Sequence, residues 1–142
     1  MFTWSHEDSM DVDLPLQKAW NFYTDPSNWP KWENRFDACV LQGALKAGSQ
    51  IKAKIKNKPI HIEIWVTEVK PYHECKCVVK SLFFTQESLC TFQEVSSQKT
   101  RIALTVCVIS FFTPFMKKLL LRNIEKTRSK RLSAFAEIAR QI

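Results

Sequence analysis

The sequence predicts an α+β fold in which one antiparallel sheet packs against helices, within a single domain that spans residues 1–142. Two patterns carry this prediction. Six stretches with the alternation of β-strands follow one another through the middle of the chain, and a helical period then runs for nearly thirty residues to the C-terminal end. The chain has 142 residues, of which 45% are apolar, which is enough to bury a core without disulfides or a structural metal.

The N-terminal part is predicted to form one strand and two short helices. Residues 2–10 alternate large apolar with polar side chains, which is typical of a strand. Pro15 suits the first turn of a helix, and Asp25-Pro26 ends it. Between them, the apolar residues that recur at helical spacing are Leu16, Ala19, Trp20 and Tyr23. A second short helix or turn is expected over residues 27–32.

The middle of the chain is predicted to form an antiparallel meander, because strand-like runs follow one another with only short turns between them. The predicted strands cover residues 37–43, 50–57, 60–70, 73–83, 86–95 and 100–111. One hairpin can be aligned residue by residue. If Asn57-Lys58 is a two-residue turn, Ile51 lies opposite Ile64 and the other pairs follow: Ala53 with Ile62, Ile55 with Ile60, Lys52 with Glu63, and Lys54 with His61. One face is then apolar and the other charged, which favours this register.

The C-terminal part, from Pro114 onward, is predicted to be the longest element, a helix of roughly 40 Å. Its apolar stripe consists of Leu121, Ile124, Leu132, Phe135, Ile138 and Ile142. Arg128 and Arg131 lie on the same stripe, where a buried guanidinium needs an acidic partner, solvent or an anionic ligand. They could bind the carboxylate or phosphate of a guest, or extend their charged ends into solvent.

Cysteine usage predicts reduced core residues and no metal site. The five cysteines (Cys39, Cys75, Cys77, Cys90 and Cys107) all lie in apolar or strand-like stretches. Cys75-x-Cys77 places two sulfurs on one strand face, but no second Cys/His pair follows at the spacing of a zinc finger. We therefore expect neither a metal nor another cofactor.

The charge distribution bears on partners and location. The formal net charge is +7, and residues 114–142 hold eight basic and two acidic side chains. Such a helix suits contact with an anionic membrane surface or simply a solvated outer face, and nucleic acid is not expected because a basic patch with stacking aromatics is lacking. No run of apolar residues is long enough to span a bilayer, and no signal peptide precedes the first strand, so the expected location is cytoplasmic.

The order of elements resembles the polyketide cyclase/START-like (SRPBCC) superfamily. The most specific stretch is DLPLQKAWNFYTDPSNWPKW, residues 13–32, with Leu45-Lys46-Ala47-Gly48-Ser49 as a second match. The resemblance implies the helix-grip fold: a curved seven-stranded antiparallel sheet wrapped around a long C-terminal helix, with two short helices between the first and second strands. Members of this superfamily include lipid carriers, hormone receptors, cyclases and hydrolase-like enzymes, so the resemblance bears on fold more than on activity.

That architecture implies an internal cavity between the sheet and the long helix. The candidate lining residues on the apolar strand face are Ile51, Ala53, Ile55, Ile60, Ile62, Ile64 and Val66. Other elements would add Trp20, Phe36, Phe92, Phe111, Phe115 and Phe135, with Arg128 and Arg131 at the mouth. The alternative is that these side chains meet and fill a solid core.

No recognisable catalytic motif is present, and whether the chain is an enzyme stays open. The pattern directs none of the three histidines inward: His6 lies in the first strand, His61 on the charged face and His73 at the start of a strand. The favoured function is binding, by carriage or sequestration, of a small hydrophobic or amphipathic molecule. The alternatives are a cyclase, dehydratase or hydrolase that uses the same pocket, and peripheral lipid-surface or partner binding through the basic helix. A monomer or a homodimer is expected, since the strand over residues 102–109 is apolar on both faces.

Overall fold

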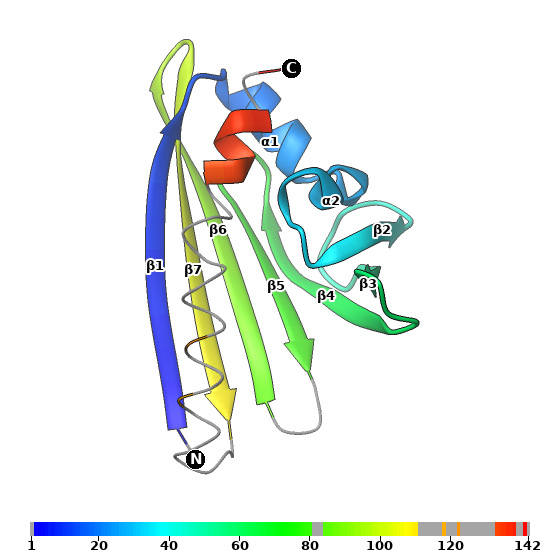
Figure 1. Cartoon of the computed structure of the whole chain (residues 1–142). Helices are drawn as coiled ribbons and strands as arrows, with labels where there is room; N and C mark the ends of the chain where they lie inside the picture. Colours follow the sequence, from blue (N-terminus) through cyan, green and yellow to red (C-terminus); the bar gives the residue numbers. More distant parts are fainter. Residues whose placement is uncertain are drawn as a thin grey trace.

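The computed structural model describes residues 2–80, 84–110 and 133–138, together with 118, 122 and 141. Within these residues the chain forms one seven-stranded sheet (Figure 1). Its strands are β1 (Phe2–Val12), β2 (Phe36–Gln42), β3 (Gln50–Ile55), β4 (His61–Lys70), β5 (Glu74–Lys80), β6 (Phe84–Ser96) and β7 (Lys99–Ser110). The order is β1-β7-β6-β5-β4-β3-β2, and every neighbouring pair is antiparallel. The predicted meander is therefore confirmed, and the first strand adds to it beside the last.

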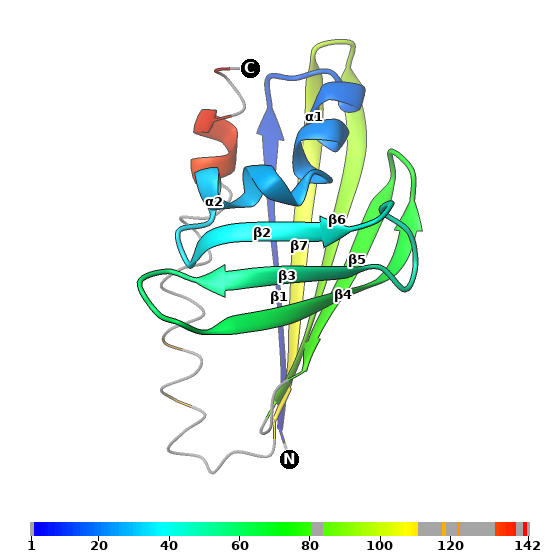
Figure 2. The ribbon, with the colours of Figure 1, turned by 90° about the vertical axis from the view of Figure 1, so that its right-hand side faces the viewer.

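The sheet is strongly bent. Figure 2 shows β2, β3 and β4 running across the view while β1 and β7 run along it. The pairing register shifts between Phe36 and Ala38, between Val66 and Glu68, and between Glu94 and Ser96. Each shift is the mark of a β-bulge, which bends the strand that carries it. The bend gives the sheet a concave face.

The helices between β1 and β2 cover one end of this concave face (Figure 1). They are α1 (Leu16–Tyr23), a 3₁₀ turn η1 (Pro26–Asn28) and α2 (Trp29–Trp32). Pro15 stands at the N-cap of α1, and Thr24 ends the helix by donating its N–H to the Trp20 carbonyl oxygen over 2.9 Å. Asp25 then caps η1 by accepting the Ser27 N–H over 3.1 Å. The stop signal expected at Asp25-Pro26 is confirmed.

Of the predicted long C-terminal helix, the structure describes a helical segment over residues 133–138, which lies beside α1 and α2 (Figures 1 and 2). The remainder of that prediction, from Pro114 to residue 132 and from 139 to 142, lies outside the described residues apart from 118, 122 and 141. The same holds for 81–83 at the end of the fifth predicted strand and for 111 at the end of the last.

The predicted register of the β3–β4 hairpin is confirmed, whereas its turn is longer than predicted. Ile51 pairs with Ile64 and Lys52 with Glu63. The strands stop at Ile55 and resume at His61, although the Ile55 N–H still reaches the Ile60 carbonyl oxygen at 2.9 Å. Asn57 adopts a left-handed conformation with φ of 61°, a geometry that asparagine tolerates better than most residues.

The core lies between the concave face and the helices. Aromatic rings from distant parts of the sequence meet there at edge-on or tilted angles. Trp20 of α1 meets Phe92 of β6 with ring centroids 5.1 Å apart, and Phe135 meets Trp32 at 5.4 Å. Thr100, fully buried, donates its hydroxyl to the Leu14 carbonyl oxygen over 2.8 Å and so ties β7 to the start of the helical region. These contacts hold α1 and α2 over the sheet.

Candidate functional site

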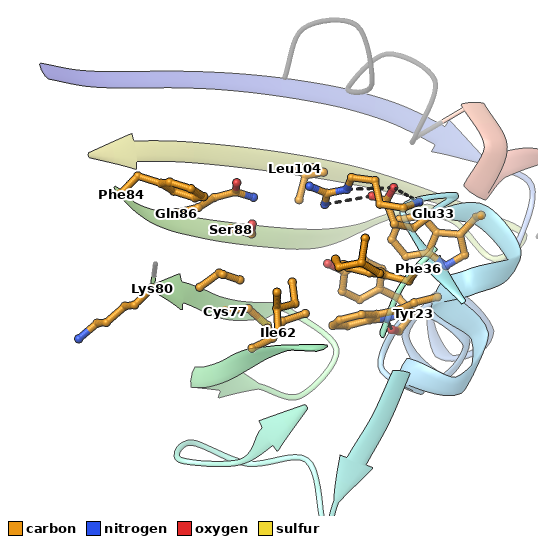
Figure 3. Close-up of a pocket in the computed structure, with 16 residues that line it drawn as sticks. Tyr23, Glu33, Phe36, Ile62, Cys77, Lys80, Phe84, Gln86, Ser88 and Leu104 are labelled. Atoms are coloured by element: carbon orange, nitrogen blue, oxygen red, sulfur yellow. Dashed lines mark hydrogen bonds and ion pairs between the residues drawn. The ribbon is translucent and has the colours of Figure 1, made fainter. Parts of the chain in front are cut away.

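A cavity of about 300 Å³ lies between the helical region and the concave face of the sheet (Figure 3). Its aromatic end is built by α1, α2 and the first residue of β2, which contribute Tyr23, Trp29, Trp32 and Phe36. The Tyr23 and Trp32 rings lie stacked with centroids 5.8 Å apart, and Trp29 donates its Nε1–H to the Tyr23 carbonyl oxygen over 2.7 Å. These rings therefore form a fixed wall rather than separate side chains.

The aliphatic wall comes from the sheet and follows from strand register. Ile64 of β4 lies directly opposite Val79 of β5, and Val79 lies opposite Gln86 of β6. Residues directly opposite one another in a sheet share a face, so this row of side chains points together into the cavity. The sheet also contributes Ile55, Ile62, Cys77, Lys80, Phe84, Ser88 and Leu104 to the lining.

An ion pair stands beside the aromatic end. The side chain of Glu33, which follows α2, is only 6% exposed, and its Oε1 lies 3.2 Å from Nε of Arg35. Nη2 of Arg35 donates to the other carboxylate oxygen over 3.3 Å (Figure 3). The guanidinium also lies over the Phe36 ring, 5.3 Å from its centroid. The pair brings a carboxylate to the rim of a mostly apolar space.

Thiols surround the phenol of Tyr23. Burial raises the pKa of Tyr23 well above its usual range, and burial likewise raises the pKa of Cys90, which contacts the phenol. The contact with Cys75, together with burial, raises the pKa of Cys77. Thiols kept protonated in this way are poor nucleophiles. They behave as core residues, and the described residues contain no disulfide and no cluster of three metal-binding side chains.

The family model described as "Polyketide cyclase / dehydrase and lipid transport" matches residues 3–137. The chain belongs to this family. No curated protein matches it in sequence.

Solved structures of this family's fold resemble the chain. The Zhui aromatase/cyclase from Streptomyces sp. R1128 has a TM-score of 0.79 at 9% identity, with 99% of this chain and 95% of that one covered. A START superfamily protein from Mycobacterium smegmatis gives 0.74 at 14% identity, with 96% and 97% covered. The di-domain ARO/CYC BexL from the BE-7585A biosynthetic pathway gives 0.79 at 13% identity; 94% of this chain is covered, but only 45% of BexL. These likenesses show the fold.

In this family member, four predicted ligand-binding residues line the cavity: Phe36, Ile55, Ile62 and Ile64. Five others lie in the core outside the cavity lining: Trp20, Ile51, Ala53, Phe92 and Phe135. The proposed residues Phe111, Phe115, Arg128 and Arg131 lie outside the described residues. Val66 is buried, whereas Ile60 is 50% exposed because the hairpin loop is wider than predicted and β4 begins only after it.

Several lining residues are not among those predicted from the sequence. Gln86 and Ser88 could have been found, because they stand at two-residue spacing from Cys90 and Phe92, the buried positions of β6. Glu33 and Arg35 carry no such signal, since they lie in the connection between α2 and β2.

The first strand shows a further difference. The sequence pattern forces no histidine inward; in the structure His6 lies opposite the buried Val106 on the concave face, and its Nε2 is 3.2 Å from Oδ1 of Asp8. Residues two apart on a strand share a face, and this explains the contact. No helix among the described residues is long and apolar enough to cross a membrane.

Proposed function

We propose that the chain binds a small hydrophobic or amphipathic molecule in the cavity between its helices and the concave face of the sheet. The observation that carries this proposal is the lining itself: about 300 Å³ bounded by aromatic rings at one end and aliphatic side chains along the sheet. Cavities of this size and character are typical of small-molecule sites. The family description, which names lipid transport, supports the same function.

Affinity would come mainly from removing apolar surface from water. Each square ångström of buried apolar area is worth roughly 25 cal/mol before the costs of association are subtracted. The stacked Tyr23–Trp32 pair offers a flat surface, and Trp29 is held by its hydrogen bond to Tyr23. A preformed wall of this kind reduces the ordering cost on binding.

Filling the cavity tests this proposal. Ile62→Trp should occupy the space and weaken binding of a naphthalene probe at least about tenfold, which corresponds to about 1.4 kcal/mol. The matched control is Ile60→Trp, which places the same side chain two residues away at a position that is 50% exposed and outside the lining. Binding is measured by calorimetry, and far-UV circular dichroism checks the fold of both variants. Equal affinities for the two variants would contradict the proposal.

A second candidate function is catalysis in the same cavity, of the cyclase, dehydratase or hydrolase type. The observation in its favour is the Glu33 carboxylate, 6% exposed at the rim and held by Arg35. Such a carboxylate can take or supply a proton during reaction of a bound molecule. The similarity in fold to an aromatase/cyclase is compatible with this candidate.

The two functions predict different outcomes for Glu33→Gln, which keeps the shape of the side chain and removes its charge. If the cavity catalyses a reaction, a compound that co-purifies with this variant should differ in mass from the one that co-purifies with the unaltered chain, by one water in the case of dehydration. Native mass spectrometry followed by denaturing extraction measures this. The same compound in both preparations would argue for binding alone.

A further inference from the structure

Strand β6 places two uncharged polar side chains in the cavity wall, which is otherwise apolar along the sheet apart from Lys80 of β5. Gln86 and Ser88 both line the cavity, one on each side of Glu87 in the sequence (Figure 3). Glu87 itself belongs to the opposite face of the sheet, where its carboxylate lies 3.9 Å from Nζ of Lys76. Because successive side chains of a strand point to opposite faces, Gln86 and Ser88 both point to the cavity side.

No described residue forms a hydrogen bond with either side chain, neither with the Gln86 amide nor with the Ser88 hydroxyl. The side chains opposite them on the neighbouring strands are apolar, apart from one thiol. Gln86 lies between Val79 and Val108, and Ser88 lies between Cys77 and Val106. Within the described part of the chain, both groups therefore keep their hydrogen-bonding capacity for a guest.

A guest without polar atoms would leave both groups unpaired. It would displace any water from them and supply no hydrogen bond in return, which lowers its affinity. A guest that carries oxygen atoms at matching positions restores those bonds. Two residues along a strand span roughly 7 Å, so the two oxygens would lie about that far apart along the guest.

We infer that Gln86 and Ser88 determine the ligand specificity of the cavity. They favour rigid, mostly apolar molecules that carry hydroxyl or carbonyl oxygens at matching positions, and they disfavour hydrocarbons of the same shape. This inference rests on the proposed binding function. The Gln86 amide can both donate and accept, and so can the Ser88 hydroxyl, so either a hydroxyl or a carbonyl oxygen satisfies them.

A matched pair of probes tests the inference. One probe is a naphthalene with a hydroxyl group on each ring, and the other has methyl groups at the same positions. Calorimetry on the full chain gives the ratio of the two affinities. The double variant Gln86→Leu, Ser88→Ala should shift this ratio toward the dimethyl probe at least about tenfold, because the variant removes both hydrogen-bonding groups.

Two further variants serve as a control on the opposite face of the strand and as a smaller single substitution. Thr85→Val changes polarity on the same strand but on the opposite face, and it should leave the ratio within about twofold. Ser88→Ala alone, a small change that the fold should tolerate, should shift the ratio by about threefold or more in the same direction.

An unchanged ratio in Ser88→Ala and in the double variant, with both probes still bound, would overturn the specificity role and leave the binding function standing. Failure of the unaltered chain to bind either probe would overturn the specificity role and the binding function together.

Discussion

Asp37 shows how a single exposed carboxylate supports the hairpin loop. Its Oδ2 accepts from Nζ of Lys54 over 2.7 Å and from the Asn57 N–H over 3.2 Å. The bond from Lys54, followed by the bond from the Asn57 backbone, lowers the pKa of Asp37. Both donors favour the charged form.

The pH dependence follows from the direction of this shift. Because the pKa of Asp37 is lower in the folded chain, its contribution to stability is present above the unfolded value of about 3.9 and is lost as the pH falls through the folded value. NMR titration of the Asp37 carboxyl should give a midpoint below about 3.9. Lys54→Met should move the midpoint upward, while Lys52→Met, on the same strand, should not. A midpoint unaffected by Lys54→Met would contradict this assignment.

The cysteines differ in exposure, and their reactivity should differ accordingly. Cys39, Cys75, Cys77 and Cys90 are buried, whereas Cys107 of β7 is partly exposed. Burial, with a smaller effect from Glu33, raises the pKa of Cys39 to about 12, and burial raises the pKa of Cys90 further. The reactive thiolate is therefore scarce at Cys39 and Cys90 near neutral pH.

We predict that iodoacetamide modifies Cys107 first in the folded chain, and that Cys39 and Cys90 react only after unfolding. Mass spectrometry of proteolytic peptides, sampled over time with and without urea, measures the order. Labelling of Cys90 as fast as Cys107 in the folded chain would show that the core around Tyr23 opens readily. Cys107→Ser is the control, since it should remove the fast phase alone.

At the scale of elements, the β3–β4 hairpin shows which features a sequence pattern can determine. Its register was predictable because any slip by one residue would bring lysines such as Lys52 to the buried face occupied by Ile51 and Ala53. The turn was not predictable in the same way. The left-handed Asn57 and the bond from its N–H to Asp37 depend on β2, which lies next to β3.

The conformation of Asn57 gives a prediction for this element. A β-branched side chain is strained at φ of 61°, so Asn57→Val should destabilise the fold by about 1–2 kcal/mol, whereas Asn57→Gly should be nearly neutral. Lys58→Val is the matched control, because Lys58 is exposed and is not among the residues with positive φ. Urea denaturation measures the differences. Equal stability of Asn57→Val and Lys58→Val would contradict this account of the turn.

At the scale of the whole molecule, the cavity could be predicted in part. Ile55, Ile62 and Ile64 were recognisable from strand alternation, because successive residues of a strand point to opposite faces of the sheet. Trp20 and Phe92 illustrate the limit: they pack against each other in the core instead of lining the cavity. Which large apolar residues meet one another depends on how α1 crosses the bent sheet, and that is a property of the tertiary structure.

Phe135 connects the end of the chain with its beginning. It is 2% exposed, and its ring lies 5.4 Å from that of Phe22 and 5.4 Å from that of Trp32. A third contact, at 6.0 Å, is with Tyr23, which lines the cavity. Phe135 therefore packs against Tyr23 and Trp32, two of the aromatic residues that line the cavity, and helps to hold them in place.

We predict that Phe135→Ala lowers the free energy of unfolding by about 3–5 kcal/mol, because it removes a large buried ring and leaves a void among three other rings. Phe135→Leu should cost less, since it retains much of the volume. Gln141→Ala, at an exposed position near the same end, should change stability by no more than about 0.5 kcal/mol. Urea denaturation followed by tryptophan fluorescence measures all three. A loss below about 1 kcal/mol for Phe135→Ala would show that this end of the chain contributes little to the core, and that α1 and α2 are held over the sheet by Trp20 and Leu14 instead.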